Sequence, residues 1–123
     1  MNNWDIFRRL DSVVVRLILD GRVEEALEIL AHEHQVKIPR IRVGLPKRSK
    51  RRAMGCYASK NETISVANSD TLKNPFVILH EFYHHLRTSA DGKHRGTEKR
   101  ADTFAKDFLQ AYALITNNEM GNN

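Results

Sequence analysis

Two histidines and a glutamate lie close together in the sequence His80-Glu81-Phe82-Tyr83-His84. On an α-helix, His80 and His84 are one turn apart on the same face, so both imidazoles can bind one metal ion. Glu81 is rotated by about 100° from His80, so its carboxylate can approach a metal-bound water without binding the metal itself. This spacing predicts two zinc ligands and a general base on one helix.

A catalytic zinc site needs three protein ligands and an open position for water, so the pattern predicts another ligand downstream. The downstream residues that can bind a metal are His85, His94, Glu98 and Asp102. His85 is rotated by about 100° from His84, and we expect it at the helix surface or behind the ligands. A histidine six residues after His84, a spacing typical of metzincins, is excluded because that residue is Ala90. His94, in a glycine-containing loop, stays an alternative ligand.

Glu98 and Asp102 are four residues apart and share one face of a predicted helix. Glu98 lies in the first turn and can bind the metal directly. Asp102, one turn further on, can accept a hydrogen bond from the outer N–H of a metal-binding imidazole, which would fix the orientation of that ring. Ala101 keeps this face small, so the two helices can pack closely enough to share one ion.

These two motifs together resemble those of the gluzincin metallopeptidases. The resemblance rests on His80-Glu81-x-x-His84 and on Glu98-x-x-Ala101-Asp102-x-Phe104-Ala105. The second motif looks most like that of the ImmA/IrrE-type and HtpX-like peptidases, and the small size of the chain is similar to that of the minigluzincins. The resemblance covers residues 74–105, and the predicted strands before them match the family in outline.

The resemblance to gluzincins implies one zinc ion, Zn²⁺, bound by His80, His84 and Glu98. It implies that Glu81 acts as base and acid, and that Asp102 orients a ligand. It also implies a zinc metallopeptidase of zincin-like fold, whose partner is a peptide or protein substrate.

The chain differs from larger gluzincins in two respects. It has no transmembrane segment, which sets aside their integral-membrane branch. It ends soon after the glutamate helix, so we expect no downstream domain that supplies a histidine or tyrosine to the oxyanion. The residues that could take this role or contact the substrate are His94, Arg95, Tyr83 and Tyr112.

The segments around the motifs predict an α+β fold: two N-terminal helices, a small sheet, and then the two metal-binding helices. Apolar residues at spacings of three and four predict helices over residues 4–20 and 22–34. Alternating residues predict about three strands in a mainly antiparallel sheet, the last two paired as a hairpin. These strands span residues 36–45, 53–59 and 63–67. Pro39 places the first strand at an edge or interrupts it.

The pair Asn74-Pro75 predicts the start of the helix that carries the histidines, with asparagine as N-cap and proline in the first turn. We expect this helix to end at about residue 88. The last helix is predicted over residues 97–116. Residues 117–123 are predicted to be a frayed tail.

The composition, 41% hydrophobic and 28% charged residues, is typical of a soluble globular protein. We expect one domain over residues 1–123, divided into a helical segment (1–35), a sheet (36–68) and the metal-binding helices (74–116). No apolar run approaches the about 18 residues that cross a bilayer, and the N-terminus has no secretory signal. The single cysteine, Cys56, excludes an intrachain disulfide. These features predict a cytoplasmic protein that does not contact membranes.

The net charge of +5 arises largely from the basic run between Lys47 and Arg52. Such a run could contact the phosphates of a nucleic acid or an acidic partner. The simpler interpretation is a solvated basic loop, because no aromatic residues are interleaved with the cations.

The predicted activity is that of a zinc-dependent metalloendopeptidase. In this mechanism a zinc-activated water would attack the scissile carbonyl, and Glu81 would take the proton of the water and pass it to the leaving amine. The peptide would lie along an exposed strand edge, and residues 63–67 are the predicted edge. The alternatives are a metal-containing regulatory or DNA-associated module with little peptidase turnover, and a latent protease that needs activation.

Overall fold

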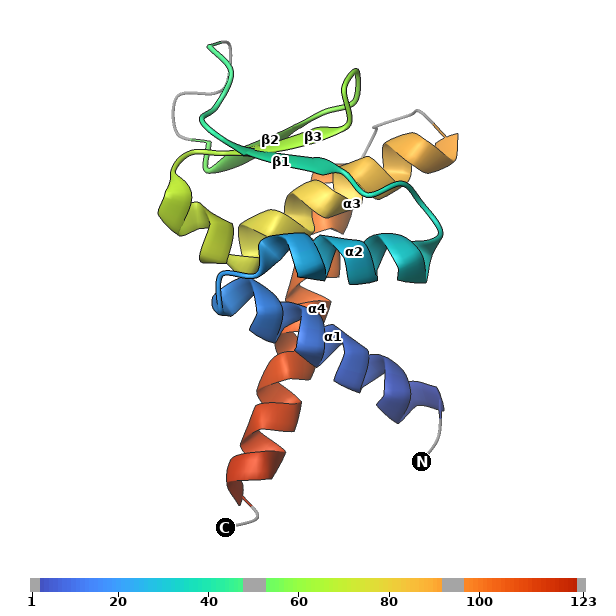
Figure 1. Ribbon diagram of the computed structural model, residues 1–123. Coiled ribbons are helices and arrows are strands. Elements are labelled where there is room, and N and C mark those ends of the chain that lie inside the picture. The colour runs from blue at the N-terminus through green and yellow to red at the C-terminus, as the bar shows by residue number, and fades with distance from the viewer. Residues whose placement is uncertain (1–2, 48–52, 92–96, 122–123) are drawn as a thin grey trace.

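The computed structural model describes residues 3–47, 53–91 and 97–121. These residues form an α+β structure in the predicted order, with two helices, a three-stranded sheet and then two further helices (Figure 1). The elements are α1 (Asn3–Leu19), α2 (Val23–His34), β1 (Arg40–Val43), β2 (Gly55–Ala58), β3 (Thr63–Val66), the 3₁₀ helix η1 (Ser69–Lys73), α3 (Pro75–Asp91) and α4 (Thr97–Gly121).

Helix α3 lies directly beneath the sheet, and α1 and α4 cross each other below α3 (Figure 1). Helix α4 makes its most extensive contacts with α1 and α3. The buried core joins apolar side chains from α1, α2, β3, α3 and α4. Its most completely buried members include Ile18, Leu27, Ile64, Ile78 and Phe82. Helix α3 is therefore held between the sheet on one side and α4 on another.

The strand order is β1-β3-β2. Strands β2 and β3 are antiparallel, with Gly55 opposite Val66, so the predicted hairpin is confirmed. Strand β1 runs parallel to β3, with Arg40 opposite Thr63, so the sheet is mixed rather than mainly antiparallel. As expected from Pro39, β1 begins after the proline and lies at an edge.

Strand β3 is the centre of the sheet, so the prediction that residues 63–67 form its exposed edge is wrong. All four residues of β3 are buried. The prediction failed because β1, which is distant in sequence, pairs with the side of β3 that the hairpin leaves open. The edges of the sheet are β1 and β2.

Alternate residues of β2 and β3 face helix α3. Ile64 and Val66 of β3 are fully buried in the core. In β2, Gly55 lies against Val77 and Tyr57 hydrogen-bonds His85, both on α3. Strand β2 is thus the edge strand that contacts the helix carrying the motif.

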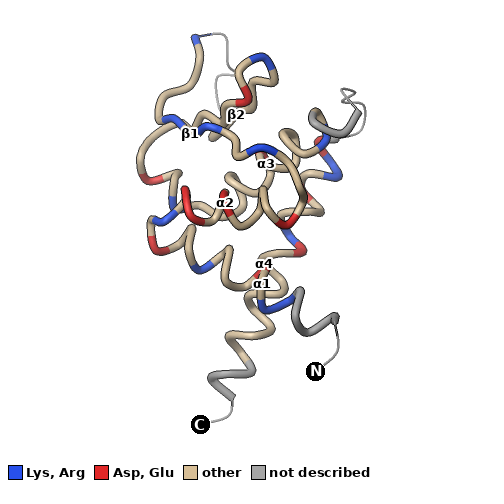
Figure 2. The backbone as a smooth tube through the Cα atoms, turned by 45° about the vertical axis from the view of Figure 1, so that its right-hand side comes forward, with Lys and Arg blue, Asp and Glu red and all other residues tan. Residues whose placement is uncertain are grey.

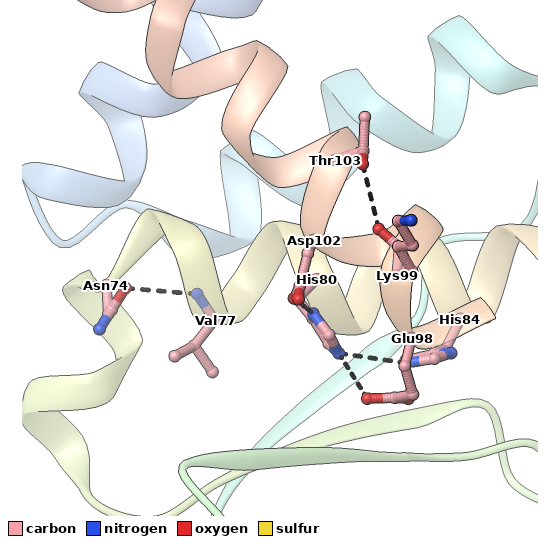
Figure 3. Close-up of polar contacts among 8 residues, drawn as sticks. All are labelled: Asn74, Val77, His80, His84, Glu98, Lys99, Asp102 and Thr103. Carbon is pink, nitrogen blue, oxygen red and sulfur yellow. Dashed lines mark hydrogen bonds and ion pairs between the residues drawn. The ribbon is translucent and has the colours of Figure 1, made fainter. Parts of the chain in front are cut away.

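The start of α3 agrees with its sequence signal. Asn74 Oδ1 accepts a hydrogen bond from the Val77 N–H at 3.3 Å, and Pro75 is the first helical residue (Figure 3). The ends of both last helices differ from the prediction. Helix α3 continues to Asp91, and α4 continues to Gly121, so the frayed tail predicted from residue 117 is wrong over residues 117–121. No proline interrupts this stretch, and glycine is a common end point for a helix.

The basic surface lies partly on β1. Arg40 and Arg42 are exposed, and Figure 2 shows basic residues along this strand. Lys47 is also exposed, whereas the rest of the predicted basic run, residues 48–52, lies outside the described residues. In the part of the chain that the structure describes, no helix has the length and apolar character to span a bilayer.

Asp11 of α1 lies within electrostatic range of two further carboxylates, Glu33 of α2 and Asp107 of α4. The pKa of Asp11 is raised from 3.8 to about 6 because burial disfavours its charged form, and the charges of Glu33 and Asp107 add to the rise. An acid whose pKa is higher in the folded state binds its proton more tightly there, so stability falls as pH rises from about 4 to above 6.

Replacing Asp11 by Asn should remove the loss of stability that the ionised Asp11 carboxylate causes at higher pH. After allowance for solvent screening, we expect the free energy of unfolding to rise by about 1 kcal/mol at pH 7.5 and to be unchanged below pH 4. Urea denaturation at both pH values measures the difference. The same substitution at the exposed Asp20 is the control for the general effect of removing a carboxylate. Equal gains at both pH values for Asp11→Asn would contradict the account.

Candidate metal centre

Side chains from the two predicted motifs meet where α3 passes the start of α4. His80, His84 and Glu98 each present one ligand atom, and these atoms all lie within 4.8 Å of one another (Figure 3). Glu98 Oε1 is 2.8 Å from His84 Nε2, and Glu98 Oε2 is 3.3 Å from His80 Nε2. The two Nε2 atoms are 3.3 Å apart. The three residues are close enough together to bind a metal ion.

Small and aromatic residues of α4 set its distance from α3. Ala101 and Ala105 are fully buried, so the backbones of the two helices can approach closely. The Phe104 ring lies beside Phe82 and Tyr83 of α3, with centroid separations of 6.4 and 5.4 Å. This packing places the first turn of α4 beside the histidine face of α3, as the sequence predicts for Ala101.

Asp102 determines which ring nitrogen of His80 carries the proton. His80 Nδ1 is 2.9 Å from Asp102 Oδ1 (Figure 3). A carboxylate only accepts, so Nδ1 carries a proton and donates it in this hydrogen bond. The neutral ring therefore has a bare lone pair on Nε2, facing His84 and the carboxylate of Glu98. A lone pair and a carboxylate oxygen repel each other, so this arrangement requires a proton or a metal cation between them.

The donor set fits a divalent metal ion. Two imidazole nitrogens and one carboxylate oxygen are a ligand set found in catalytic zinc sites. Ligands about 2.0–2.2 Å from a tetrahedral zinc ion are separated by roughly 3.3–3.6 Å, and two of the three observed separations are 3.3 Å. Glu98 is 79% exposed, whereas the side chains of His80 and His84 are 14% and 12% exposed. The centre is therefore accessible from the Glu98 side.

Glu81 lies beside this centre but on a different face of α3. It is 8% exposed and is not among the three residues that could hold the ion. The pKa of Glu81 is raised to about 7, chiefly by burial; His80 opposes the rise, and the charge of Glu98 adds to it. A carboxyl group that titrates near neutral pH is suited to accept and release a proton.

The other predicted site residues have different surroundings. His94 and Arg95 lie outside the described residues, so both stay predictions. The Tyr83 ring packs against Phe104. Tyr112 lies next to Arg16 of α1, about 15 Å along α4 from Asp102. Neither tyrosine is brought to the metal-binding atoms by these contacts.

Sequence reasoning did not identify two residues of β2 that contact α3 near the centre. A Cβ atom on Gly55 would lie 3.3 Å from Glu81 Cγ, and Tyr57 Oη is 2.8 Å from His85 Nδ1. The available signal was a second helical pair on α3, since Glu81 and His85 are also four residues apart. His85 is fully buried and faces the sheet, so it is not at the helix surface, and its hydrogen bonds go to Tyr57 and Lys37 rather than to a ligand.

Comparisons with protein-family models, with curated proteins and with solved structures each find no match. The resemblance to gluzincins therefore rests on the residues of the two motifs and on their geometry.

Replacing Glu98 by Ala should remove one-to-one zinc binding, because the imidazoles alone leave an incomplete ligand set. Replacing Asp102 by Asn should weaken zinc binding by about 10- to 100-fold, because the orientation of His80 is loosened while its ligand atom remains. Competition with a chromogenic chelator measures both affinities.

Glu24 is the matched control for Glu98. It is also an exposed glutamate in the first turn of a helix, α2, and Glu24→Ala should leave zinc affinity unchanged. Full zinc affinity in Glu98→Ala would show that Glu98 is not a ligand.

Proposed function

We propose that this protein is a zinc-dependent metalloendopeptidase of the gluzincin type. The observation that carries the proposal is the convergence of His80, His84 and Glu98, with Asp102 orienting His80 from behind. Glu81 adds a buried carboxyl group on the adjacent helix face. This combination supports hydrolysis better than a structural metal site, because the centre is open on one side and has a base beside it.

Each residue has a defined role in this proposal. A bound zinc ion would supply Lewis-acid polarisation of a peptide carbonyl and acidify a water molecule. His80, His84 and Glu98 would hold the ion, and Asp102 would keep the Nε2 lone pair of His80 directed at it. Glu81 would accept the proton of the attacking water and donate it to the leaving amine.

The substrate surface in this proposal is the outer edge of β2. Among the strands that the structure describes, β2 is an edge of the sheet and pairs with β3, and an edge strand is where an extended peptide can add to a sheet. Gly55 of this strand lies directly against Glu81. A peptide added to β2 would therefore run past Glu81, which is not true of β1 at the opposite edge.

Replacing Glu81 by Gln tests the mechanism. The variant should bind zinc with wild-type stoichiometry, since Glu81 is not a ligand, but its hydrolysis rate should fall by about 100-fold or more, because the amide cannot accept a proton. Release of fluorescence from dye-quenched casein measures hydrolysis, and the zinc content is determined on the same samples.

Activity that survives in Glu81→Gln would contradict the assigned role of the base.

A regulatory or DNA-associated module is the second candidate function, and it is favoured by the exposed Arg40 and Arg42 of β1. Salt-sensitive DNA binding that is lost when both arginines are replaced, in a wild-type protein that cleaves no casein, would support this function instead.

A further inference from the structure

Helix α3 presents two separate pairs of side chains, each one turn apart. His80 and His84 face α4 and form the candidate metal centre. Glu81 and His85 face the sheet, where Gly55 and Tyr57 of β2 lie against them. The first pair would hold the metal, whereas the second pair lies between the centre and β2, next to the contact of Val77 with Gly55.

The hydrogen bonds of His85 define its protonation pattern. Its Nε2 is 2.7 Å from the carbonyl oxygen of Lys37, and its Nδ1 is 2.8 Å from Tyr57 Oη. A carbonyl oxygen only accepts, so Nε2 carries a proton and donates it to Lys37. In the neutral ring Nδ1 is then an acceptor, and the Tyr57 hydroxyl donates to it. Full burial of His85 leaves no water to replace these partners.

The two contacts, Gly55 with Glu81 and Tyr57 with His85, are separated by nearly the same distance along β2 and along α3. Gly55 and Tyr57 are two residues apart on a strand, which is about 6.7 Å. Glu81 and His85 are four residues apart on a helix, which is about 6 Å. Both contacts can therefore form together only in one register, because a shift of β2 by one residue would turn Gly55 and Tyr57 to the opposite face.

Gly55 and Tyr57 make different kinds of contact. A Cβ atom at Gly55 would lie only 2.8 Å from Val77 Cγ1, so glycine allows the backbone of β2 to touch α3 beside Glu81. This contact is van der Waals packing and has little direction. The Tyr57–His85 hydrogen bond is directional, and it fixes the position of β2 along the helix axis.

We propose that Tyr57 and His85 are positioning residues that hold β2 in register with Glu81 and the metal centre. This inference rests on the proposed peptidase function, because a peptide paired with β2 reaches Glu81 only in this register. Loss of the hydrogen bond should let β2 move relative to Glu81. It should leave the metal ligands in place, because they lie on another face of α3 and are held by Asp102 and α4.

The Tyr57→Phe variant tests this inference, because it removes the hydroxyl and keeps the ring that lies edge-on to His85 at 5.4 Å. We expect kcat for casein to fall about 10- to 100-fold, with zinc affinity unchanged within twofold. In the zinc-free protein, backbone amides of residues 55–58 should exchange with solvent about 3- to 10-fold faster.

Thr71→Val is the matched control, because it also removes a hydroxyl that makes a side-chain hydrogen bond, here from Thr71 to Asn68 Oδ1 at 2.9 Å at the start of η1. It should lower stability by a similar amount and leave kcat and exchange of β2 unchanged. Equal losses of kcat in both variants would reduce Tyr57 to a stabilising role and overturn the inference.

The exchange measurement separates this inference from the proposed function. If the wild-type protein cleaves no casein, the peptidase proposal fails, but exchange in the zinc-free protein still reports on the position of β2. Unchanged exchange of residues 55–58 in Tyr57→Phe would overturn the positioning role whether or not the protein is a peptidase. Faster exchange there, with zinc affinity unchanged, would support it.

Discussion

The hydrogen bond between Asp102 and His80 is the interaction on which the candidate centre depends. In this bond the Nδ1–H of His80 donates to Asp102, so in the neutral ring the lone pair on Nε2 is directed at Glu98 and His84. Without a cation, that geometry places electron-rich atoms against one another. The hydrogen bond joins α3 to α4, so the packing of these helices and the chemistry of the centre cannot be separated. The packing of α3 against α4 places the carboxylate of Asp102 at Nδ1 of the His80 ring and the carboxylate of Glu98 at its Nε2.

Small residues allow α3 to pack closely against both α4 and β2. Ala101 and Ala105 bring α4 against the histidine face of α3, and Gly55 brings β2 against the glutamate face. Larger side chains at these positions would move the partners outward and separate the metal-binding atoms from the base and the strand edge. The same closeness buries Glu81 and so raises its pKa toward neutrality. Backbone approach, burial and proton affinity are therefore consequences of one packing arrangement.

Local signals predicted the parts of the structure that depend on neighbouring residues. Short spacings in the sequence predicted four features: the histidine pair, the pairing of Glu98 with Asp102, the cap at Asn74 and the hairpin. Contacts between distant segments were not predictable in this way. The pairing of β1 with β3 made β3 central, and the Tyr57–His85 contact depends on how the sheet lies on α3. The peptidase activity itself stays a proposal, since geometry supplies the groups but not the turnover.

X-ray absorption at the zinc edge, on protein loaded with one equivalent of zinc, tests the central claim most directly. The account predicts a first shell of nitrogen and oxygen at about 2.0–2.2 Å with no sulfur. It also predicts outer-shell scattering from two imidazole rings, and loss of this ordered shell in Glu98→Ala. A sulfur ligand at about 2.3 Å, which would have to come from Cys56 or a methionine, or scattering from fewer than two imidazoles, would contradict it.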